Sequence, residues 1–105
     1  MSSPIITPEL IEKIFKLIEA ETSFPRNSIW YEIQDDFQCI LILISIDEFD
    51  EEDLNPAFRL VADILNRTVP GRDDDLSWLV AFMKNDKRIE AYFGGNLSAP
   101  KMGLP

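Results

Sequence analysis

The sequence lacks histidine altogether, contains a single cysteine, and has only four glycines in 105 residues. Without histidine, the chain has neither the commonest general base nor the commonest metal ligand. Cys39 has no second cysteine to pair with, and it lies in an apolar run where we expect a small buried hydrophobe rather than a nucleophile. None of the glycines has the spacing of a phosphate-binding loop. We therefore expect no catalytic site, no metal site and no cofactor, and a protein that is not an enzyme.

A long hydrophobic run is also missing. Even the apolar run at residues 39–44, which no other run exceeds, is far shorter than the roughly 20 residues that a membrane helix needs. The first residues show no basic region followed by an apolar stretch, as a secretory signal would. These absences predict a cytoplasmic protein with no membrane partner.

Basic residues are scarce, with 10 Lys and Arg against 19 Asp and Glu, which gives a formal net charge of −9. The imbalance lies in residues 1–53, which hold thirteen acids and three bases, whereas residues 54–105 hold six and seven. Such a surface repels nucleic acid and anionic lipid and attracts a basic protein. The alternative is that the acidity only keeps the protein soluble.

What the sequence does contain is enough apolar material, 46% of the residues, for the core of one domain. Thr7-Pro8 predicts the start of a helix, since a capping hydroxyl precedes a proline at the first helical position. Apolar residues at helical spacing continue this helix to about Thr22. Asn55-Pro56 predicts a second helix in the same way, which ends near Thr68.

Four strands are predicted over residues 29–34, 37–46, 76–83 and 88–93. The order helix-strand-strand-helix-strand-strand predicts an α+β fold, with one antiparallel four-stranded sheet and two helices packed on one face. We expect residues 1–95 to form this single domain and residues 96–105 to form an irregular tail. The two halves align at an offset of 48 residues, Pro8 with Pro56 and Trp30 with Trp78, which fits either a duplicated unit or two similar units.

The second strand is apolar on both faces, which is typical of a central strand covered on both sides. Helices on one face leave the other face to be covered by the C-terminal tail, by a second copy of the chain or by a different partner. Trp30 shares its strand face with Glu32 and Gln34; an exposed tryptophan is common in binding hot spots, although tryptophans in sheets are more often core. The residues of this candidate apolar interface are Ile40, Ile42, Ile44 and Trp30.

Two acidic loops form the other candidate binding site. Their residues are Asp47, Glu48, Asp50, Glu51, Glu52 and Asp53 in the first loop and Asp73, Asp74 and Asp75 in the second. Neither loop has the ligand spacing of a calcium-binding EF-hand loop. Helix capping and the helix dipole explain two or three acids of the first loop. The remaining repulsion favours a basic partner, with a simply solvated loop as the alternative.

These features predict a small acidic protein that binds another protein, such as a bacterial immunity protein, antitoxin or inhibitor of a basic toxin. Its acidic loops would mimic the phosphates of a nuclease substrate, and charge complementarity would speed association. In size, acidity and mixed secondary structure the chain also resembles type III secretion chaperones, although it lacks their extra strand. That resemblance implies a homodimer built on the second strand, with apolar grooves for an effector segment.

Overall fold

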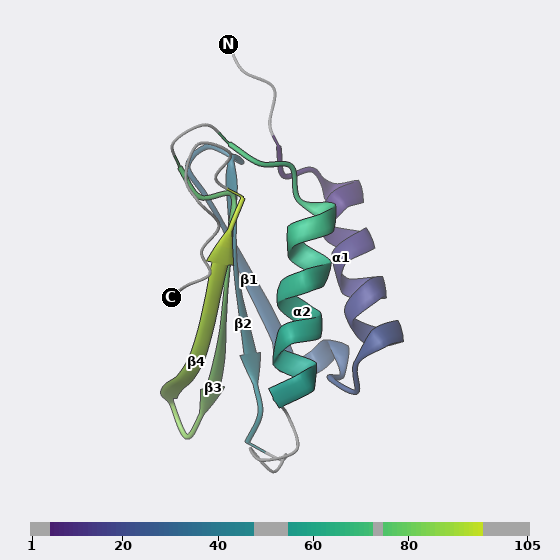
Figure 1. Ribbon diagram of the computed structural model, residues 1–105, viewed down its shortest axis with the longest axis vertical. Coiled ribbons are helices and arrows are strands. Elements are labelled where there is room, and N and C mark those ends of the chain that lie inside the picture. Colours follow the sequence, from purple (N-terminus) through teal and green to yellow (C-terminus); the bar gives the residue numbers. More distant parts are fainter. Residues whose placement is uncertain (1–4, 48–54, 73–74, 96–105) are drawn as a thin grey trace.

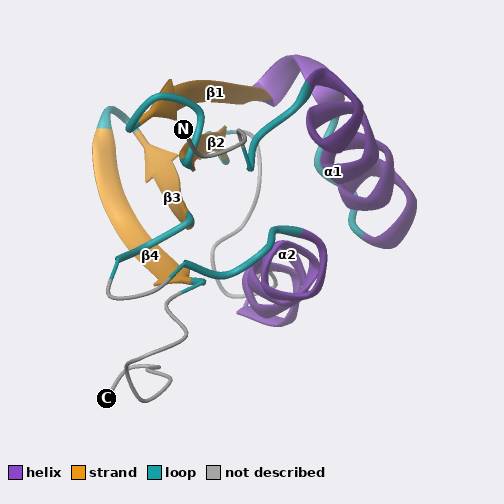
Figure 2. Cartoon of the chain, turned by 90° about the horizontal axis from the view of Figure 1, so that it is seen from above, coloured by secondary structure: helices purple, strands orange, loops and turns teal. Residues whose placement is uncertain are grey.

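The computed structural model describes residues 5–47, 55–72 and 75–95, which form one four-stranded sheet and two α-helices. The elements are α1 (Pro8–Glu21), the short 3-10 helix η1 (Arg26–Ser28), β1 (Ile29–Gln34), β2 (Cys39–Ser45), α2 (Asn55–Thr68), β3 (Trp78–Lys84) and β4 (Lys87–Gly94). Figure 1 and Figure 2 show both helices on the same side of the sheet. The predicted α+β class and the order of elements are confirmed, whereas the predicted tail at 96–105 lies outside the described residues.

The start of α1 follows from its capping residue. The Thr7 side chain accepts a hydrogen bond from the backbone N–H of Leu10 at 3.1 Å, and Pro8 occupies the first turn, where an N–H is not needed. At the other end, the N–H and the hydroxyl of Thr22 both donate to the carbonyl of Ile18. These bonds satisfy backbone groups that the helix itself leaves unpaired, so the predicted ends are confirmed to within one residue.

The second helix is tied to the first at its C-terminal end. Arg67, in the last turn of α2, forms an ion pair of 2.6 Å with Glu21, the last residue of α1. Arg67 also lies 3.6 Å from Asp63 of its own helix. The hydrogen bond that Arg67 donates to Glu21 raises the pKa of Arg67, so the guanidinium is charged throughout the ordinary pH range. The pair links the two helices where they leave the core.

The sheet has the strand order β1-β2-β3-β4 and is mixed rather than antiparallel throughout. β1 and β2 are antiparallel, as are β3 and β4, but the two central strands β2 and β3 are parallel. The prediction of a fully antiparallel sheet was therefore wrong. The physical reason is the connection through α2, because a helix that crosses over the sheet returns the chain to the end where β2 began.

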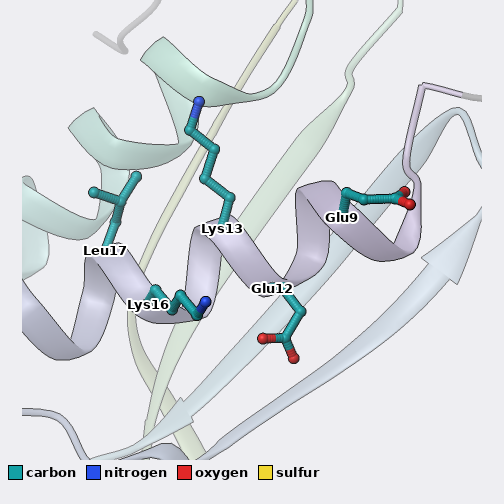
Figure 3. A pocket seen from close by; sticks show the side chains of 5 residues that line it. All are labelled: Glu9, Glu12, Lys13, Lys16 and Leu17. Carbon is teal, nitrogen blue, oxygen red and sulfur yellow. The ribbon is translucent and has the colours of Figure 1, made fainter.

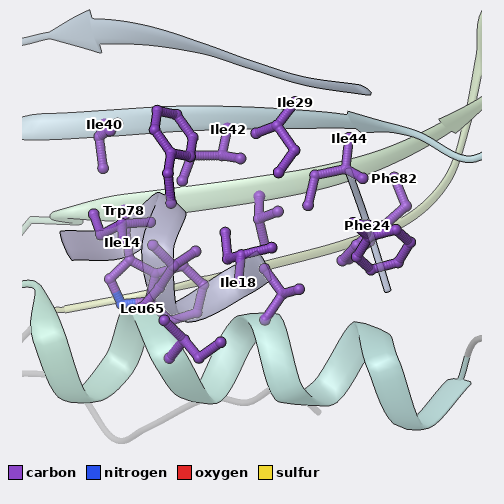
Figure 4. Packing of buried hydrophobic residues seen from close by; sticks show 14 of the residues in the cluster. Ile14, Ile18, Phe24, Ile29, Ile40, Ile42, Ile44, Leu65, Trp78 and Phe82 are labelled. Atoms are coloured by element: carbon purple, nitrogen blue, oxygen red, sulfur yellow. The ribbon is translucent and has the colours of Figure 1, made fainter. Parts of the chain in front are cut away.

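The face of the sheet that meets the helices is the core. In register, Ile40 lies beside Trp78, Ile42 beside Val80, and Ile44 beside Phe82. All six are at most 3% exposed. From α2, Phe58 packs against Phe82 with ring centroids 4.1 Å apart. Figure 4 shows Ile40, Ile42 and Ile44 of β2 on the side of the sheet where Ile14, Ile18 and Leu65 of the helices lie.

The turn between β1 and β2 is longer than predicted, and three of its residues have a strained backbone. Asp35, Asp36 and Phe37 have φ angles of 53°, 54° and 67°, in the left-handed region that disfavours residues with a Cβ. The carbonyl of Phe37 accepts hydrogen bonds from the N–H groups of Ile5 and Ile6, which fixes the turn. β2 consequently begins at Cys39 instead of residue 37.

The two tryptophans that align at an offset of 48 residues lie on opposite faces of the sheet. Trp78 is on the core face and 3% exposed, whereas Trp30 is on the other face and 57% exposed. Side chains alternate between the two faces along a strand. An offset that aligns Trp30 with Trp78 therefore aligns the surface residues of one half with the core residues of the other. The strands therefore give no support to a duplication at this spacing.

Candidate protein-binding surface

Three of the four residues predicted for an apolar interface lie in the core. Ile40, Ile42 and Ile44 are 0% exposed, because the isoleucine face of β2 is the one against which the helices pack. They cannot contact a partner in this fold, and the prediction is corrected accordingly. These buried side chains also cannot form the interface of a chaperone-like dimer. Trp30 is the only one of the four that is exposed.

The opposite side of the sheet carries a second apolar layer, which we call the outer sheet face. In register, Trp30 lies beside Leu43, which lies beside Ala81, and the neighbouring row places Leu41 beside Leu79 and Leu79 beside Phe93. The outer sheet face comprises Trp30, Leu41, Leu43, Leu79, Ala81, Met83 and Phe93. It spans all four strands.

Within the described residues, no helix packs on the outer sheet face, since α1 and α2 both lie on the core side (Figure 2). Trp30 and Phe93, on the two edge strands, are 57% and 47% exposed, while the leucines between them are half-buried by their neighbours. Large aromatic side chains around a partly buried apolar centre are typical of surfaces that bind proteins.

Only one residue of each predicted acidic loop is described, and these two residues lie far apart. Residues 48–53 and 73–74 lie outside the described residues, but Asp47 and Asp75 are described and both are exposed. Asp47 follows β2 and accepts a hydrogen bond of 2.8 Å from the N–H of Asn85, whereas Asp75 precedes β3. Because β2 and β3 are parallel, the end of one and the start of the other lie at opposite ends of the sheet. A single site that uses Asp47 and Asp75 together is therefore excluded.

Arg72 partly neutralises the acids at one of these ends, a role that sequence reasoning missed. Its guanidinium lies 3.2 Å from Asp35 and 3.2 Å from Asp75, and it donates to the carbonyl of Leu76 at 2.8 Å. The Arg72 side chain is only 18% exposed. Asp75 thus has a structural role in this fold. The pairing with Asp35 spans 37 residues of sequence, and no local pattern signals it.

The single thiol, that of Cys39, lies near this cluster and is buried. Cys39 is 3% exposed, and burial raises its pKa, with a further rise from Asp35 that exceeds the lowering by Arg72. A thiol with a raised pKa carries little thiolate at neutral pH, which is the nucleophilic form. The prediction of a buried hydrophobe at this position is confirmed.

A shallow depression runs along the exposed side of α1, lined by Glu9, Glu12, Lys13, Lys16 and Leu17. Figure 3 shows Lys13 extending toward α2 and Glu12 pointing away from it. Glutamates and lysines at this helical spacing form a solvated, mutually compensating surface.

The part of the chain that the structure describes contains no cluster of three or more acidic or thiol side chains able to hold a metal ion. Neither α1 nor α2, the described α-helices, has the length and apolar character that crossing a membrane demands. Comparison with protein-family models gave no match, and comparisons with curated proteins and with solved structures gave none either.

Proposed function

We propose that this chain is a non-catalytic domain that binds and neutralises another protein, and that this partner is basic, such as the nuclease domain of a toxin. In this proposal the chain acts as an immunity protein, antitoxin or inhibitor. The observation that carries the binding role is the outer sheet face, an apolar layer with Trp30 and Phe93 exposed. Exposed tryptophan in such a setting contributes disproportionately to protein binding.

The charge of the chain supports a basic partner. Residues 1–53 hold thirteen acids and three bases, and the formal net charge of the whole chain is −9. Charge of one sign speeds association with an oppositely charged protein and repels nucleic acid. Glu32 lies two residues from Trp30 on β1, and Asp35 and Asp36 follow the end of the strand; all three are exposed. The outer sheet face with these acids at its border would therefore complement a partner surface that has an apolar patch surrounded by basic residues.

The test begins with affinity capture of the tagged chain from lysate of its source organism, at low and at high salt. We expect one basic protein in equimolar amount, released as salt rises, and the purified pair should then show loss of the partner's activity at one-to-one ratio. Capture of acidic or neutral proteins only, or binding without loss of activity, would refute neutralisation.

Two sets of variants separate the surfaces. Replacement of Trp30 or Phe93 by Ala should weaken binding by roughly ten- to thirtyfold, the loss typical of a hot-spot side chain. The double change Glu51→Lys and Asp53→Lys tests the first acidic loop and should slow association. Leu60→Ala is the matched control, since Leu60 is 39% exposed on α2, on the other side of the sheet. Full affinity in all three outer-face and loop variants would rule out both surfaces.

A further inference from the structure

β1 is an edge strand with an open side. It lies at the end of the strand order, and β2 is its only strand partner in the described part of the chain. Three consecutive residues of this strand are exposed, with Trp30 at 57% and Tyr31 at 43%. Every second residue of an edge strand directs its N–H and C=O groups away from the sheet, so β1 offers a free row of hydrogen-bonding groups.

The other edge of the sheet is protected against such pairing, and β1 is not. β4 has a register shift opposite Phe82 and Met83, and it carries the exposed charges of Lys87, Arg88 and Glu90. Bulges and charged side chains are the devices that keep edge strands from joining other strands. β1 pairs with β2 in regular register and has no proline, glycine or lysine, and Glu32 is its single charged residue.

We propose that β1 pairs antiparallel with β1 of a second copy of this chain, which joins the two sheets into one continuous sheet. A two-fold axis perpendicular to the sheet keeps the two core faces on the same side. Residues that lie opposite each other must then point to the same face of the sheet. The axis therefore passes midway between one residue and the same residue of the second copy, so that this residue lies opposite itself. This inference uses the free edge of β1 and not the outer sheet face, although Trp30, Glu32 and Asp36 border both, and it does not rest on the proposed function.

The side chains of β1 favour Tyr31 as the residue that lies opposite its own copy, next to the two-fold axis. That register places Tyr31 beside Tyr31 of the second copy, Ile29 beside Ile33, and Trp30 beside Glu32. The first two pairs extend the apolar core face across the junction, where Tyr31 already packs 5.5 Å from Phe15. An axis through Glu32 would oppose two carboxylates, which is destabilising, and an axis through Trp30 would pair fewer residues.

The charges at the two ends of β1 are complementary in an antiparallel pair. Arg26 precedes the strand and Asp36 follows it, and both are exposed and without an ion pair among the described residues. The Arg26 guanidinium lies 3.9 Å from the centre of the Phe15 ring, which in turn packs against Tyr31 of β1. Antiparallel pairing brings Arg26 of each copy to Asp36 of the other, once at each end of the junction. At about 0.15 M salt the remaining negative charges are screened beyond roughly 8 Å.

Sedimentation equilibrium of the full chain over about 1 to 500 µM, at 0.15 M salt, tests the proposal. One short strand pair is a small interface, so we expect a weak dimer with a Kd on the order of 10 µM. Tyr31→Lys places two ammonium groups together on the axis and should be a folded monomer at all these concentrations. Leu60→Lys, at a similarly exposed apolar position on α2, should dimerise like the wild type. A monomeric wild type, or a Tyr31→Lys variant that dimerises normally, overturns the proposal.

Charge exchange tests the antiparallel orientation independently of Tyr31. Arg26→Glu and Asp36→Lys should each weaken dimerisation by about tenfold, since each change alters two symmetry-related pairs. The double variant should recover most of the loss, because the introduced carboxylate of each copy then meets the introduced ammonium group of the other. The two positions lie at opposite ends of β1, so they cannot pair within one copy. Additive losses in the double variant, with circular dichroism showing folded protein, would contradict the antiparallel arrangement.

Discussion

At the scale of single residues, Cys39 shows how burial removes reactivity and ties stability to pH. Its thiol has a raised pKa in the folded chain, first because of burial and second because of Asp35. In the unfolded chain the thiol ionises near its ordinary value of about 8.5. Below that pH both states hold the proton and the thiol does not affect the pH dependence. Above it only the unfolded state loses the proton, so folding becomes less favourable until the raised pKa is passed.

We therefore expect the contribution of Cys39 to the free energy of unfolding to be level near pH 7.5 and to fall above about pH 8.5, the ordinary pKa of a thiol. Cys39→Ala should flatten this decline, by at most about 1.4 kcal/mol per pH unit. Urea unfolding under reducing conditions measures both curves, and the slopes rather than the absolute values are compared. Burial also raises the pKa of Tyr92, which adds a similar decline at higher pH and serves as an internal reference. If the free energy of unfolding depends on pH in the same way in the wild type and in Cys39→Ala, the thiol has the same pKa in the folded and in the unfolded chain.

At the scale of elements, the turn from β1 to β2 combines backbone strain with a fixed function in the fold. Phe37 has a φ angle of 67° and is 54% exposed, so its conformation is imposed by the turn and by the hydrogen bonds of Ile5 and Ile6 to its carbonyl. A left-handed residue with a Cβ costs about 1–2 kcal/mol relative to its usual conformation. Glycine avoids this cost.

The test compares Phe37→Gly with Phe37→Ala, because both remove the side chain and they differ in the Cβ alone. We expect the glycine variant to be more stable by about 1 kcal/mol in urea unfolding, since only alanine is strained there. Ala20→Gly in the exposed side of α1 is the control, and there glycine should be less stable by about 1 kcal/mol. The same sign at both positions would mean that the turn does not hold Phe37 in the left-handed region.

Element boundaries were predictable from the sequence where a local signal exists. Thr7-Pro8 marked the start of α1 because a capping side chain acts within one helical turn. The direction of β3 relative to β2 was not predictable from local patterns, since it depends on how α2 crosses the sheet.

The candidate site was harder to predict than the fold. Both faces of β2 are apolar, so alternation alone could not tell which face the helices cover. Trp30 was the useful signal, because its neighbours on that face, Glu32 and Gln34, favour solvent. Arg72 was missed because its pairing with Asp35 exists only once the sheet has formed. The acidic residues 48–53 were visible as a charge run, but a charge run does not specify a position in the fold.

At the scale of the whole molecule, the charge imbalance acts on every property at once. The net charge of −9 is carried by a chain with a radius of gyration of 13.4 Å, so like charges lie close together. Two like charges about 10 Å apart repel by roughly 0.4 kcal/mol in water. Each described ion pair, such as Arg67 with Glu21, has at least one partner that is largely exposed, so these pairs offset little of this repulsion. The same acidity that would attract a basic partner therefore opposes the folded state.

This repulsion predicts that salt stabilises the chain. Raising NaCl from about 0.01 to 0.3 M shortens the screening length from roughly 30 Å to less than 8 Å and should increase the free energy of unfolding by about 1 kcal/mol. The Tyr31→Lys variant at micromolar concentration keeps association out of the measurement. Adding Glu51→Lys and Asp53→Lys to the Tyr31→Lys variant should reduce the increase in stability that salt produces, because fewer like charges then repel. A neutral osmolyte at equal osmolality controls for effects of the salt other than screening. A loss of stability with salt would mean that attractive ion pairs outweigh the net charge in this fold.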